Sequence, residues 1–460
     1  MRAGLFIILA GILCTGAGSP ARAQPDPIVY NGRWKNGIPS DTAFFPIAVW
    51  LQSPANAAKY KQAGVNLYIG LWEGPTQAQL SALATAGMRV ICDQNAVGLQ
   101  NAASKTIVGW MHNDEPDNAQ AKADGSGYDP CIAPSQIVSG YESMRAKDST
   151  RPVYLNLGRG VAVTDWIGRG TCTGKTDMYA QYAQGADILS FDVYPVNSGE
   201  SKVRGNLWYV SKGVDSLARW SDRAKPVWTW FETTRIAETP ADKPTPAQVR
   251  SEVWMAIIHG ATGIGYFCHS FFPATVEAGF FGDNAMLTGI TALNLQIQSL
   301  APVLNSPTAS EAATVASISS VAPINILVKR HGGYTYVFAA AMRPGQVTAT
   351  FTVPEGVEAV VLGEDRSIPL AGGKFSDTFS DYGVHLYRIA GSRTGLAFRN
   401  RNLEQSGGAY FFNGMERPHF AGMILIPETA GSGLAAPWIL DAGGRFRGPW
   451  TPAARDGARR

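Results

Sequence analysis

The stretch IVGWMHNDEPDN at residues 107–118 joins an apolar, strand-like run to an abrupt polar turn. Similar apolar runs, each followed by a helix-like segment, occupy residues 45–51, 65–72, 88–94, 152–158, 186–195, 226–231 and 263–269. Strands that are apolar on both faces and alternate with helices predict a buried parallel sheet. Eight such pairs within about 260 residues predict a (β/α)8 barrel, the α/β fold called a TIM barrel.

A doubly wound open sheet is the main alternative for this alternation. Such a sheet usually has fewer strands, and a glycine-rich phosphate loop after the first strand would favour it. The segment after the first run, SPANAAKYKQAG at 53–64, contains no such loop. The pattern therefore favours the closed barrel.

The hydrophobic period changes after the barrel segment. Short alternating runs such as INILVKR (324–330) and YTYVFAAA (334–341) are separated by turn signals and predict a small antiparallel β-sandwich. The last residues are rich in Gly, Arg, Ala and Pro without a sustained period, which predicts a low-order tail. We expect a signal peptide at 1–23, the barrel at 24–308, the sandwich at 309–391 and the tail at 392–460.

The N-terminus has the features of a secretory signal. Arg2 precedes the apolar run GLFIILAGILC at 4–14, and Ala21-Arg22-Ala23 forms a small-x-small cleavage site. The apolar run is too short to span a bilayer, and no later run is long enough. We therefore expect a secreted or periplasmic protein without a membrane span.

Five cysteines are present, and Cys14 leaves with the predicted signal. Cys131 and Cys172 lie in polar loops rich in Gly and Pro, so we expect a disulfide between them in an oxidising compartment. Two free thiols are the alternative for this pair. Cys92 and Cys268 lie in apolar runs and are expected to be buried thiols.

Composition and motifs exclude several classes of function. The net charge of +3 arises from the signal and the tail, so no basic stripe for nucleic acid is present. No HExxH spacing or Cys/His cluster predicts a metal site, and no G-x-S-x-G elbow predicts a serine hydrolase. We expect neither a cofactor nor a metal. The sequence does not predict the oligomeric state.

Two of the apolar runs end on a glutamate, Glu115 after the fourth run and Glu232 after the seventh. Catalytic groups of such barrels lie at the carboxyl ends of the strands, so both side chains are expected at the barrel mouth. Hydrolysis of a glycosidic bond needs one carboxyl group to protonate the leaving oxygen. It needs a second to attack the anomeric carbon or to activate water. The alternative for either glutamate alone is an exposed loop carboxylate.

This arrangement resembles the retaining glycoside hydrolases of clan A, in which the acid/base glutamate follows strand four and the nucleophilic glutamate follows strand seven. The DEP tripeptide at 114–116 is similar to the strand-four motif of several families of that clan. The resemblance implies that Glu115 is the acid/base and Glu232 the nucleophile. It also implies that Tyr194 hydrogen-bonds the nucleophile.

The resemblance extends to substrate contacts but departs from the clan at two strands. Asp114 stands where the clan usually has an asparagine that contacts the sugar 2-hydroxyl, and Asn113 is an alternative for that role. Strand two lacks the arginine that is often found there. Strand eight ends without the usual tryptophan, and His269 or Phe271 stands in its place. These departures leave the family unassigned.

Other residues near the strand ends are candidates for the cleft. An aromatic ring can stack on the apolar face of a sugar, or it can be an ordinary core residue. The candidate rings are Trp50, Trp72, Trp110 and Trp230. The polar candidates, which line the cleft or cap helices, are Gln52, Asp93, Asn95, Asn156 and Asp192.

Taken together, the sequence predicts an enzyme that cleaves a poly- or oligosaccharide. Two alternatives stay open. One is a carbohydrate-binding barrel that has lost catalysis, which would keep the aromatic cleft without two converging carboxylates. The other is a polysaccharide lyase or esterase that uses a base such as His112 or Tyr194.

Overall fold

The computed structural model describes residues 25–238, 242–317, 319, 322–391, 439–440 and 446–447. The predicted signal peptide lies outside the described residues. Within the predicted tail only two short strands are described, β19 (Ile439–Leu440) and β20 (Phe446–Arg447), which pair antiparallel. The described residues up to 391 belong to one compact unit, which ends at residue 392.

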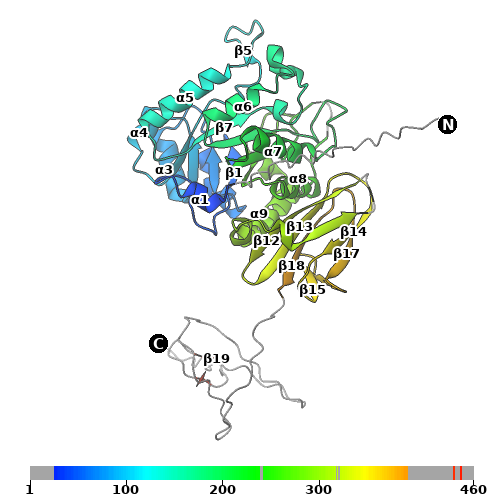
Figure 1. Cartoon of the computed structure of the whole chain (residues 1–460). Coiled ribbons are helices and arrows are strands. Elements are labelled where there is room, and N and C mark those ends of the chain that lie inside the picture. Colours follow the sequence, from blue (N-terminus) through cyan, green and yellow to red (C-terminus); the bar gives the residue numbers. More distant parts are fainter. Residues whose placement is uncertain are drawn as a thin grey trace, which may run out of the picture. The chain divides into compact units, whose positions relative to one another are not determined.

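Eight parallel strands close into a barrel (Figure 1). In barrel order they are β1 (Ile47–Trp50), β2 (Leu67–Ile69), β3 (Arg89–Cys92), β4 (Ile107–Met111), β7 (Val153–Leu157), β8 (Ile188–Asp192), β9 (Val227–Glu232) and β10 (Gly263–Phe267). β1 pairs with both β2 and β10, which closes the sheet. Every apolar run predicted to be a barrel strand forms one, so the predicted TIM barrel is confirmed.

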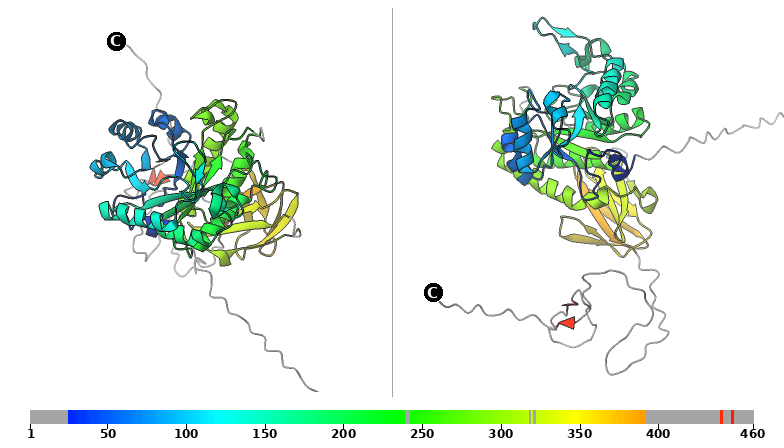
Figure 2. Two further views of the ribbon diagram at one scale, coloured as in Figure 1. Left: turned by 90° about the horizontal axis from the view of Figure 1, so that it is seen from above. Right: turned by 90° about the vertical axis from the view of Figure 1, so that its left-hand side faces the viewer.

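Helices lie around the outside of the barrel (Figure 2, left). The described α-helices are α1 (Pro27–Asn31), α2 (Ala57–Gln62), α3 (Gln77–Ala86), α4 (Ala96–Gln100), α5 (Pro134–Lys147), α6 (Met178–Tyr182), α7 (Tyr209–Trp220), α8 (Pro246–Ile258) and α9 (Asn284–Leu304). The helices α3 and α8 begin with capping boxes, in which Thr76 and Thr245 exchange hydrogen bonds with Gln79 and Gln248. These bonds satisfy backbone N–H groups that have no partner within the helix.

Two tryptophans of β9 define how the barrel interior is packed. Trp228 and Trp230 belong to the apolar cluster inside the barrel and are almost fully buried. The neighbouring strand β10 places Gly263 and Gly265 beside them, where a Cβ atom would lie 2.4 Å from Trp228 and 2.2 Å from Trp230. Because these two positions carry no side chain, the indole rings fit inside the barrel at the packing density of a protein core.

A β-sandwich follows the barrel and packs against α8 and α9. Its three-stranded sheet has the order β11 (Thr314–Ser317), β14 (Val347–Thr352), β17 (Lys374–Phe379). Its five-stranded sheet has the order β12 (Ile324–His331), β13 (Tyr334–Ala341), β18 (Val384–Ala390), β15 (Glu358–Val361), β16 (Arg366–Pro369). The predicted sandwich is therefore confirmed. The ring of Trp254 on α8 stacks on Phe338 of β13, with the ring centroids 5.3 Å apart.

A disulfide joins two loops at the carboxyl ends of the barrel strands. The loop after β4 contains the hairpin β5 (Gln120–Ala121) and β6 (Tyr128–Asp129), which projects from the barrel (Figure 2, right). Cys131 of this loop is bonded to Cys172 of the segment after β7, as predicted. Cys92 and Cys268 are free and buried, also as predicted.

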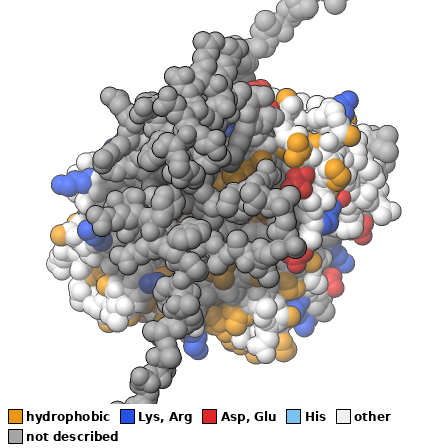
Figure 3. Space-filling view, turned by 90° about the horizontal axis from the view of Figure 1, so that it is seen from below, with side chains coloured by type: hydrophobic (Ala, Val, Ile, Leu, Met, Phe, Trp, Pro, Cys, Tyr) orange, Lys and Arg blue, Asp and Glu red, His pale blue; other side chains and the backbone are white. Residues whose placement is uncertain are grey.

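Within the described ranges, no helix is both long enough and apolar enough to cross a bilayer. Figure 3 shows one face of the molecule, on which basic and acidic side chains are both present around the periphery. The visible part of this face is therefore mixed in charge.

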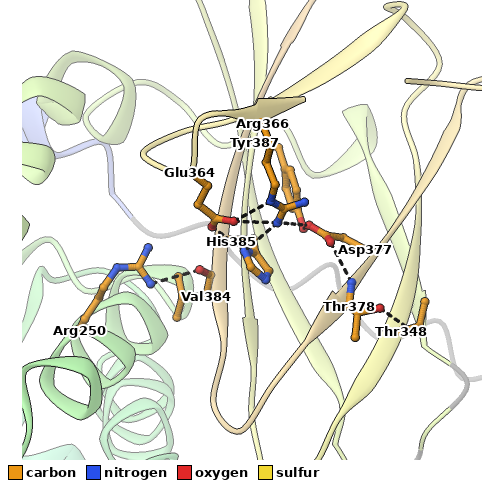
Figure 4. A network of polar contacts seen from close by, with 9 residues as sticks. All are labelled: Arg250, Thr348, Glu364, Arg366, Asp377, Thr378, Val384, His385 and Tyr387. Carbon is orange, nitrogen blue, oxygen red and sulfur yellow. Dashed lines mark hydrogen bonds and ion pairs between the residues drawn. The ribbon is translucent and has the colours of Figure 1, made fainter. Parts of the chain in front are cut away.

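A polar network links the two sheets of the sandwich (Figure 4). The Arg366 guanidinium donates to Glu364 at 2.7 Å and to Asp377 at 2.7 Å, and the Tyr387 hydroxyl donates to Asp377 at 2.9 Å. His385 Nδ1 lies 2.6 Å from the other oxygen of Glu364. Burial acts to raise the pKa of Asp377, but the hydrogen bonds from Arg366 and Tyr387 outweigh it and lower this pKa. The ionised Asp377 therefore stabilises the fold.

We predict that Asp377→Asn destabilises the protein by about 1–3 kcal/mol, because the buried Tyr387 and the half-buried Arg366 lose a charged acceptor. The pKa of Asp377 is lower in the folded than in the unfolded chain. Its contribution is therefore complete above the unfolded pKa and is lost as the pH falls through the folded pKa. Urea unfolding at neutral pH and near pH 3 measures both effects. The exposed Glu358→Gln is the control, and equal stability losses in the two variants would contradict the prediction.

We also predict that removal of the Cys131–Cys172 disulfide lowers the free energy of unfolding. The bonded residues are 41 positions apart, and a loop of that length corresponds to about 4 kcal/mol in the chain-entropy model. Thermal unfolding of the Cys131→Ser/Cys172→Ser variant measures the loss. Adding a reductant should lower the melting temperature of the wild type and leave that of the double variant unchanged. A reductant effect of the same size in both would argue against this origin.

Candidate active site

A cavity of about 220 Å³ lies at the carboxyl ends of the barrel strands. Its walls combine three carboxyl groups and an amide with aromatic rings. The lining residues are Trp50, Asp114, Glu115, Asn156, Asp192, Tyr194, Trp230, Ile236, Phe267 and Phe271. Ring faces with a few convergent polar groups are typical of a site for a small polar molecule that also has apolar faces.

A second cavity, of about 240 Å³, lies near the amino ends of β1 and β10 and is lined mainly by apolar atoms. Its two charged residues already have partners. Asp26 caps α1 by accepting from Ile28 and Val29, and Lys329 donates to the carbonyl of Ser306. This cavity holds no carboxyl cluster, so the cavity at the carboxyl ends is the candidate active site.

Glu115 is held in an unusual backbone conformation at the edge of the cavity. Its φ is +42°, in the left-handed region that side chains other than glycine rarely adopt. The backbone N–H of Glu115 donates to the carbonyl of Asn156 at 3.2 Å, and Asn118 Nδ2 donates to Glu115 Oε2 at 2.8 Å. Strain of this kind costs on the order of 1 kcal/mol and concentrates at functional sites.

The pKa of each carboxyl group that lines the cavity lies above its ordinary value. Burial, followed by the charges of Asp114 and Asp117, raises the pKa of Glu115 to about 7. Burial likewise raises the pKa of Asp114 to about 6, against the hydrogen bond from Asn156. Burial and the charge of Glu115 raise the pKa of Asp192 well above its ordinary value. A group that titrates near neutral pH can both give and take a proton during a reaction.

A chain of hydrogen bonds from the barrel interior orients Asn156. Trp230 Nε1 donates to the Tyr154 hydroxyl at 3.0 Å, and this hydroxyl lies 2.5 Å from Ser190 Oγ. Ser190 Oγ in turn donates to Asn156 Oδ1 at 2.6 Å. The Asn156 amide must therefore present its N–H₂ group to the cavity, where Nδ2 donates to Asp114 at 2.9 Å and to Asp192 at 3.1 Å.

Asp117 supports the loops around the cavity and was not among the residues predicted from the sequence. It is fully buried, and its oxygens accept from the backbone N–H of Gly158 at 2.7 Å and from the Tyr179 hydroxyl at 2.8 Å. The Arg169 guanidinium lies 3.9 Å away. Asp117 therefore links the loop after β4 to the loop after β7. The one available signal was its position, two residues after Glu115 in the same acidic run.

Glu232, the other predicted catalytic glutamate, is fully buried and does not line the cavity. Its oxygens accept from the backbone N–H groups of Val196 at 2.6 Å and Asn197 at 2.8 Å, and from Asn197 Nδ2. Asn197 Oδ1 also accepts from the backbone N–H of Ile236 at 2.9 Å. Burial raises the pKa of Glu232 to about 7, although these donors act against the rise.

Tyr194 lines the cavity, while the donors to Glu232 come from the next residues along the same loop. Glu232 therefore joins the loop after β8 to the strand end of β9. In the structure, the two predicted catalytic glutamates do not face the same cavity.

The four tryptophans predicted to stack on a sugar differ in how exposed their rings are. Trp50 and Trp230 line the cavity, with ring centroids 4.9 Å apart in an edge-on contact. Trp72 is 57% exposed, and its ring lies edge-on to His269 at 6.4 Å. Trp110 is fully buried in the layer between barrel and helices, where its indole N–H donates to Asp148 at 3.0 Å. The prediction that Trp110 stacks on a sugar is therefore wrong, because no ring face is accessible.

The remaining predicted polar residues also separate into two groups. Asp114, Asn156 and Asp192 line the cavity, whereas Asn113 is exposed outside it. His269 is buried and does not line the cavity. Its ring packs against Phe267, which does, with the two ring centroids 5.0 Å apart.

Three further polar candidates do not line the cavity. Gln52 is buried and accepts from the Tyr60 hydroxyl, while Asn95 caps α4 by accepting from the Gly98 N–H. Asp93 is absent from the cavity lining. Among the described residues, no group of three or more His, Cys, Asp or Glu side chains has an arrangement that could hold a metal ion.

No protein-family model and no curated protein sequence matches the chain. Solved structures give matches to several carbohydrate-active enzymes. A family 42 β-galactosidase from G. stearothermophilus is 8% identical with a TM-score of 0.49, and the match covers 78% of this chain and all of that one. A family 30 xylanase from Clostridium acetobutylicum is 12% identical with a TM-score of 0.41, covering 75% and 95%. An Anoxybacillus α-amylase is 10% identical with a TM-score of 0.41, covering 77% and 100%. At these values the matches assign no family, substrate or residue role to this chain.

Proposed function

We propose that this protein hydrolyses a glycosidic bond in an oligo- or polysaccharide, with Glu115 as the proton donor. The observation that carries the proposal is the position of Glu115. It is a carboxyl group with a pKa of about 7, held in a strained backbone at the edge of an aromatic cavity in a TIM barrel. A general acid for glycosidic oxygen needs such a raised pKa, since it must still carry its proton near neutral pH.

The cavity walls suit a sugar ring. Trp50, Trp230, Phe267 and Phe271 offer apolar surfaces, while Asn156 and the carboxyl groups offer hydrogen bonds to hydroxyls. Stacking of a sugar ring on an aromatic face uses the apolar C–H surface of the sugar and leaves its hydroxyls free for such bonds. The exposed Trp72 is proposed as a further contact outside the cavity.

For the second carboxylate, we keep the proposal that Glu232 is the nucleophile of a retaining double displacement. The three N–H donors around it stabilise the ionised form that a nucleophile needs. They also occupy the oxygens that would attack the anomeric carbon. For Glu232 to act as the nucleophile, the loop that carries Val196 and Asn197 must therefore release it when substrate binds.

A non-catalytic carbohydrate-binding protein is the second candidate function. The burial of Glu232 favours it, because a binding protein needs the aromatic cavity but not two carboxylates that converge on one bond. The strained Glu115 favours the enzyme. We further propose export of the protein, which the Cys131–Cys172 disulfide supports because such bonds persist in oxidising compartments.

We predict that Glu115→Gln lowers kcat/KM for a glycoside by about 10²–10⁴-fold, since the leaving oxygen loses its proton donor. In the wild type, kcat/KM should fall as the pH rises through about 7, where Glu115 loses its proton. Sugar release from a panel of plant, fungal and bacterial polysaccharides measures both. The exposed helix residue Glu142→Gln serves as the control. Full activity of Glu115→Gln would refute the assignment.

We predict that Glu232→Ala is inactive on a glycoside and that sodium azide restores turnover. Azide would attack the anomeric carbon in place of the missing carboxylate, giving a glycosyl azide of inverted configuration while Glu115 protonates the leaving oxygen. Product analysis by NMR is the measurement. If Glu232 only anchors the loop, azide has no effect. The same loss of activity and melting temperature is then expected in Asn197→Ala, which removes the other side of the contact.

A further inference from the structure

The side chain of Asn118 holds one oxygen of Glu115. Its Nδ2 donates to Glu115 Oε2 at 2.8 Å, and the backbone N–H of Asn118 donates to the carbonyl of Glu115 at 3.1 Å. Glu115 lines the cavity, whereas Asn118 lies outside its lining. The contact therefore acts on the cavity through the carboxyl group of Glu115.

The Asn118 amide is packed against Gly158, the residue that follows β7. A Cβ atom at Gly158 would lie 2.5 Å from Asn118 Nδ2 and 2.9 Å from its Oδ1. Gly158 has a φ of −80° and a ψ of −177°, an extended conformation that any residue can adopt. The backbone would therefore accept a side chain at this position, and the Asn118 amide occupies the space that such a side chain would need.

Two further contacts anchor the turn that carries Glu115 and Asn118. The backbone N–H of Gly158 donates to Asp117 Oδ1 at 2.7 Å. Gln120 Nε2 donates to the carbonyls of Glu115 at 3.2 Å and of Asn118 at 2.8 Å. Because the turn is tied to the end of β7 in this way, the position of the Asn118 amide relative to the Glu115 carboxyl group is fixed.

We infer that Asn118 is the positioning residue for Glu115 and that it places the proton of this acid on Oε1. In a protonated carboxyl group the carbonyl oxygen is the better acceptor, so the oxygen that accepts from Asn118 is the one without the hydrogen. Oε2 accepts from Asn118, and the hydrogen therefore belongs on Oε1. The role of this contact in glycoside cleavage rests on the proposed function.

In that reaction, the hydrogen on Oε1 goes to the leaving glycosidic oxygen. The bond from this oxygen to the anomeric carbon breaks, and its electron pair stays on the oxygen. Glu115 becomes a carboxylate whose Oε2 is stabilised by the Asn118 N–H, and it later takes a proton from the water that attacks the anomeric carbon. Orientation matters for this step, because a misplacement of about 1 Å costs on the order of 10²-fold in rate.

Other groups also act on the titration of Glu115. Burial is the main cause of its raised pKa, and the hydrogen bond from Asn118 acts against the rise. Removing the Asn118 amide changes none of the other titratable groups, so a shift in the titration reports the loss of this donor. These other groups are Asp114 and Asp117 of the same loop, Asp192 of β8 and Tyr194 after β8.

Two variants test the inference by different routes. Asn118→Ala removes the donor, whereas Gly158→Ala adds a Cβ atom that displaces the amide while Asn118 stays in the chain. On glycosides with a poor leaving group, which must be protonated, we expect both to lose about 10²-fold in kcat/KM. On aryl glycosides with a good leaving group, the loss should stay within about threefold. Equal losses on both kinds of substrate would overturn the inference, because a general structural defect does not depend on the leaving group.

The double variant Asn118→Ala/Gly158→Ala shows whether the two changes act through one contact. If they do, its loss equals that of Asn118→Ala alone, and losses that multiply would overturn the assignment. Matched controls should keep the activity of the wild type. They are Asn101→Ala, whose amide donates to the Val97 carbonyl, and Gly282→Ala, where a Cβ atom meets nothing within 4 Å.

Infrared titration of the substrate-free, full-length protein separates this inference from the proposed function. Difference spectra between each protein and its Glu115→Gln counterpart isolate the carboxyl band of Glu115. In Asn118→Ala and Gly158→Ala the band should titrate at higher pH, since the ionised form loses a donor, and should lie at higher wavenumber, since the carbonyl oxygen loses a hydrogen bond. An unmoved band would overturn the inference even if glycosides are cleaved. If the band moves but the wild type cleaves no glycoside, the proposed function fails while the positioning contact stands.

Discussion

The indole of Trp230 connects the packing of the barrel with the chemistry of its mouth. One side of the ring fills the space that Gly265 leaves open, and the other side forms a wall of the cavity beside Trp50. Its N–H begins the hydrogen-bond chain through Tyr154 that ends on Asn156. The orientation of the amide that faces the carboxyl groups is therefore a consequence of how the barrel interior is filled.

Much of the fold could be predicted from the sequence because buried strands and helices have distinct periods. All eight barrel strands and the change to alternating strands in the sandwich follow from this signal. The strands β11 and β16 are harder to predict, since TVAS and RSIP are short and partly exposed and give weak patterns. The disulfide could be predicted from the polar, Gly/Pro-rich sequence around each cysteine, and both cysteines lie outside the α-helices and β-strands.

The candidate site was less predictable, because strand ends fix the neighbourhood of a residue but not the direction of its side chain. Glu115 and Asp192 lie at strand ends and reach the cavity, whereas Glu232 lies at a strand end and is captured by the loop of Val196. Trp110 illustrates the same difficulty, since its place in β4 directs it outward to the helices. Loop conformations and amide orientations depend on contacts between distant segments, which hydrophobic patterns do not encode.

The left-handed backbone of Glu115 has a consequence for how this protein diverges. A glycine at this position would adopt the same conformation without strain, so selection for stability alone would remove the glutamate. Under the proposed function, a glutamate persists there because its carboxyl group is the proton donor. Under the same proposal, loss of Glu115 in favour of glycine or asparagine among descendants of this chain would mark lineages in which the cavity no longer cleaves glycosides while the barrel has become more stable.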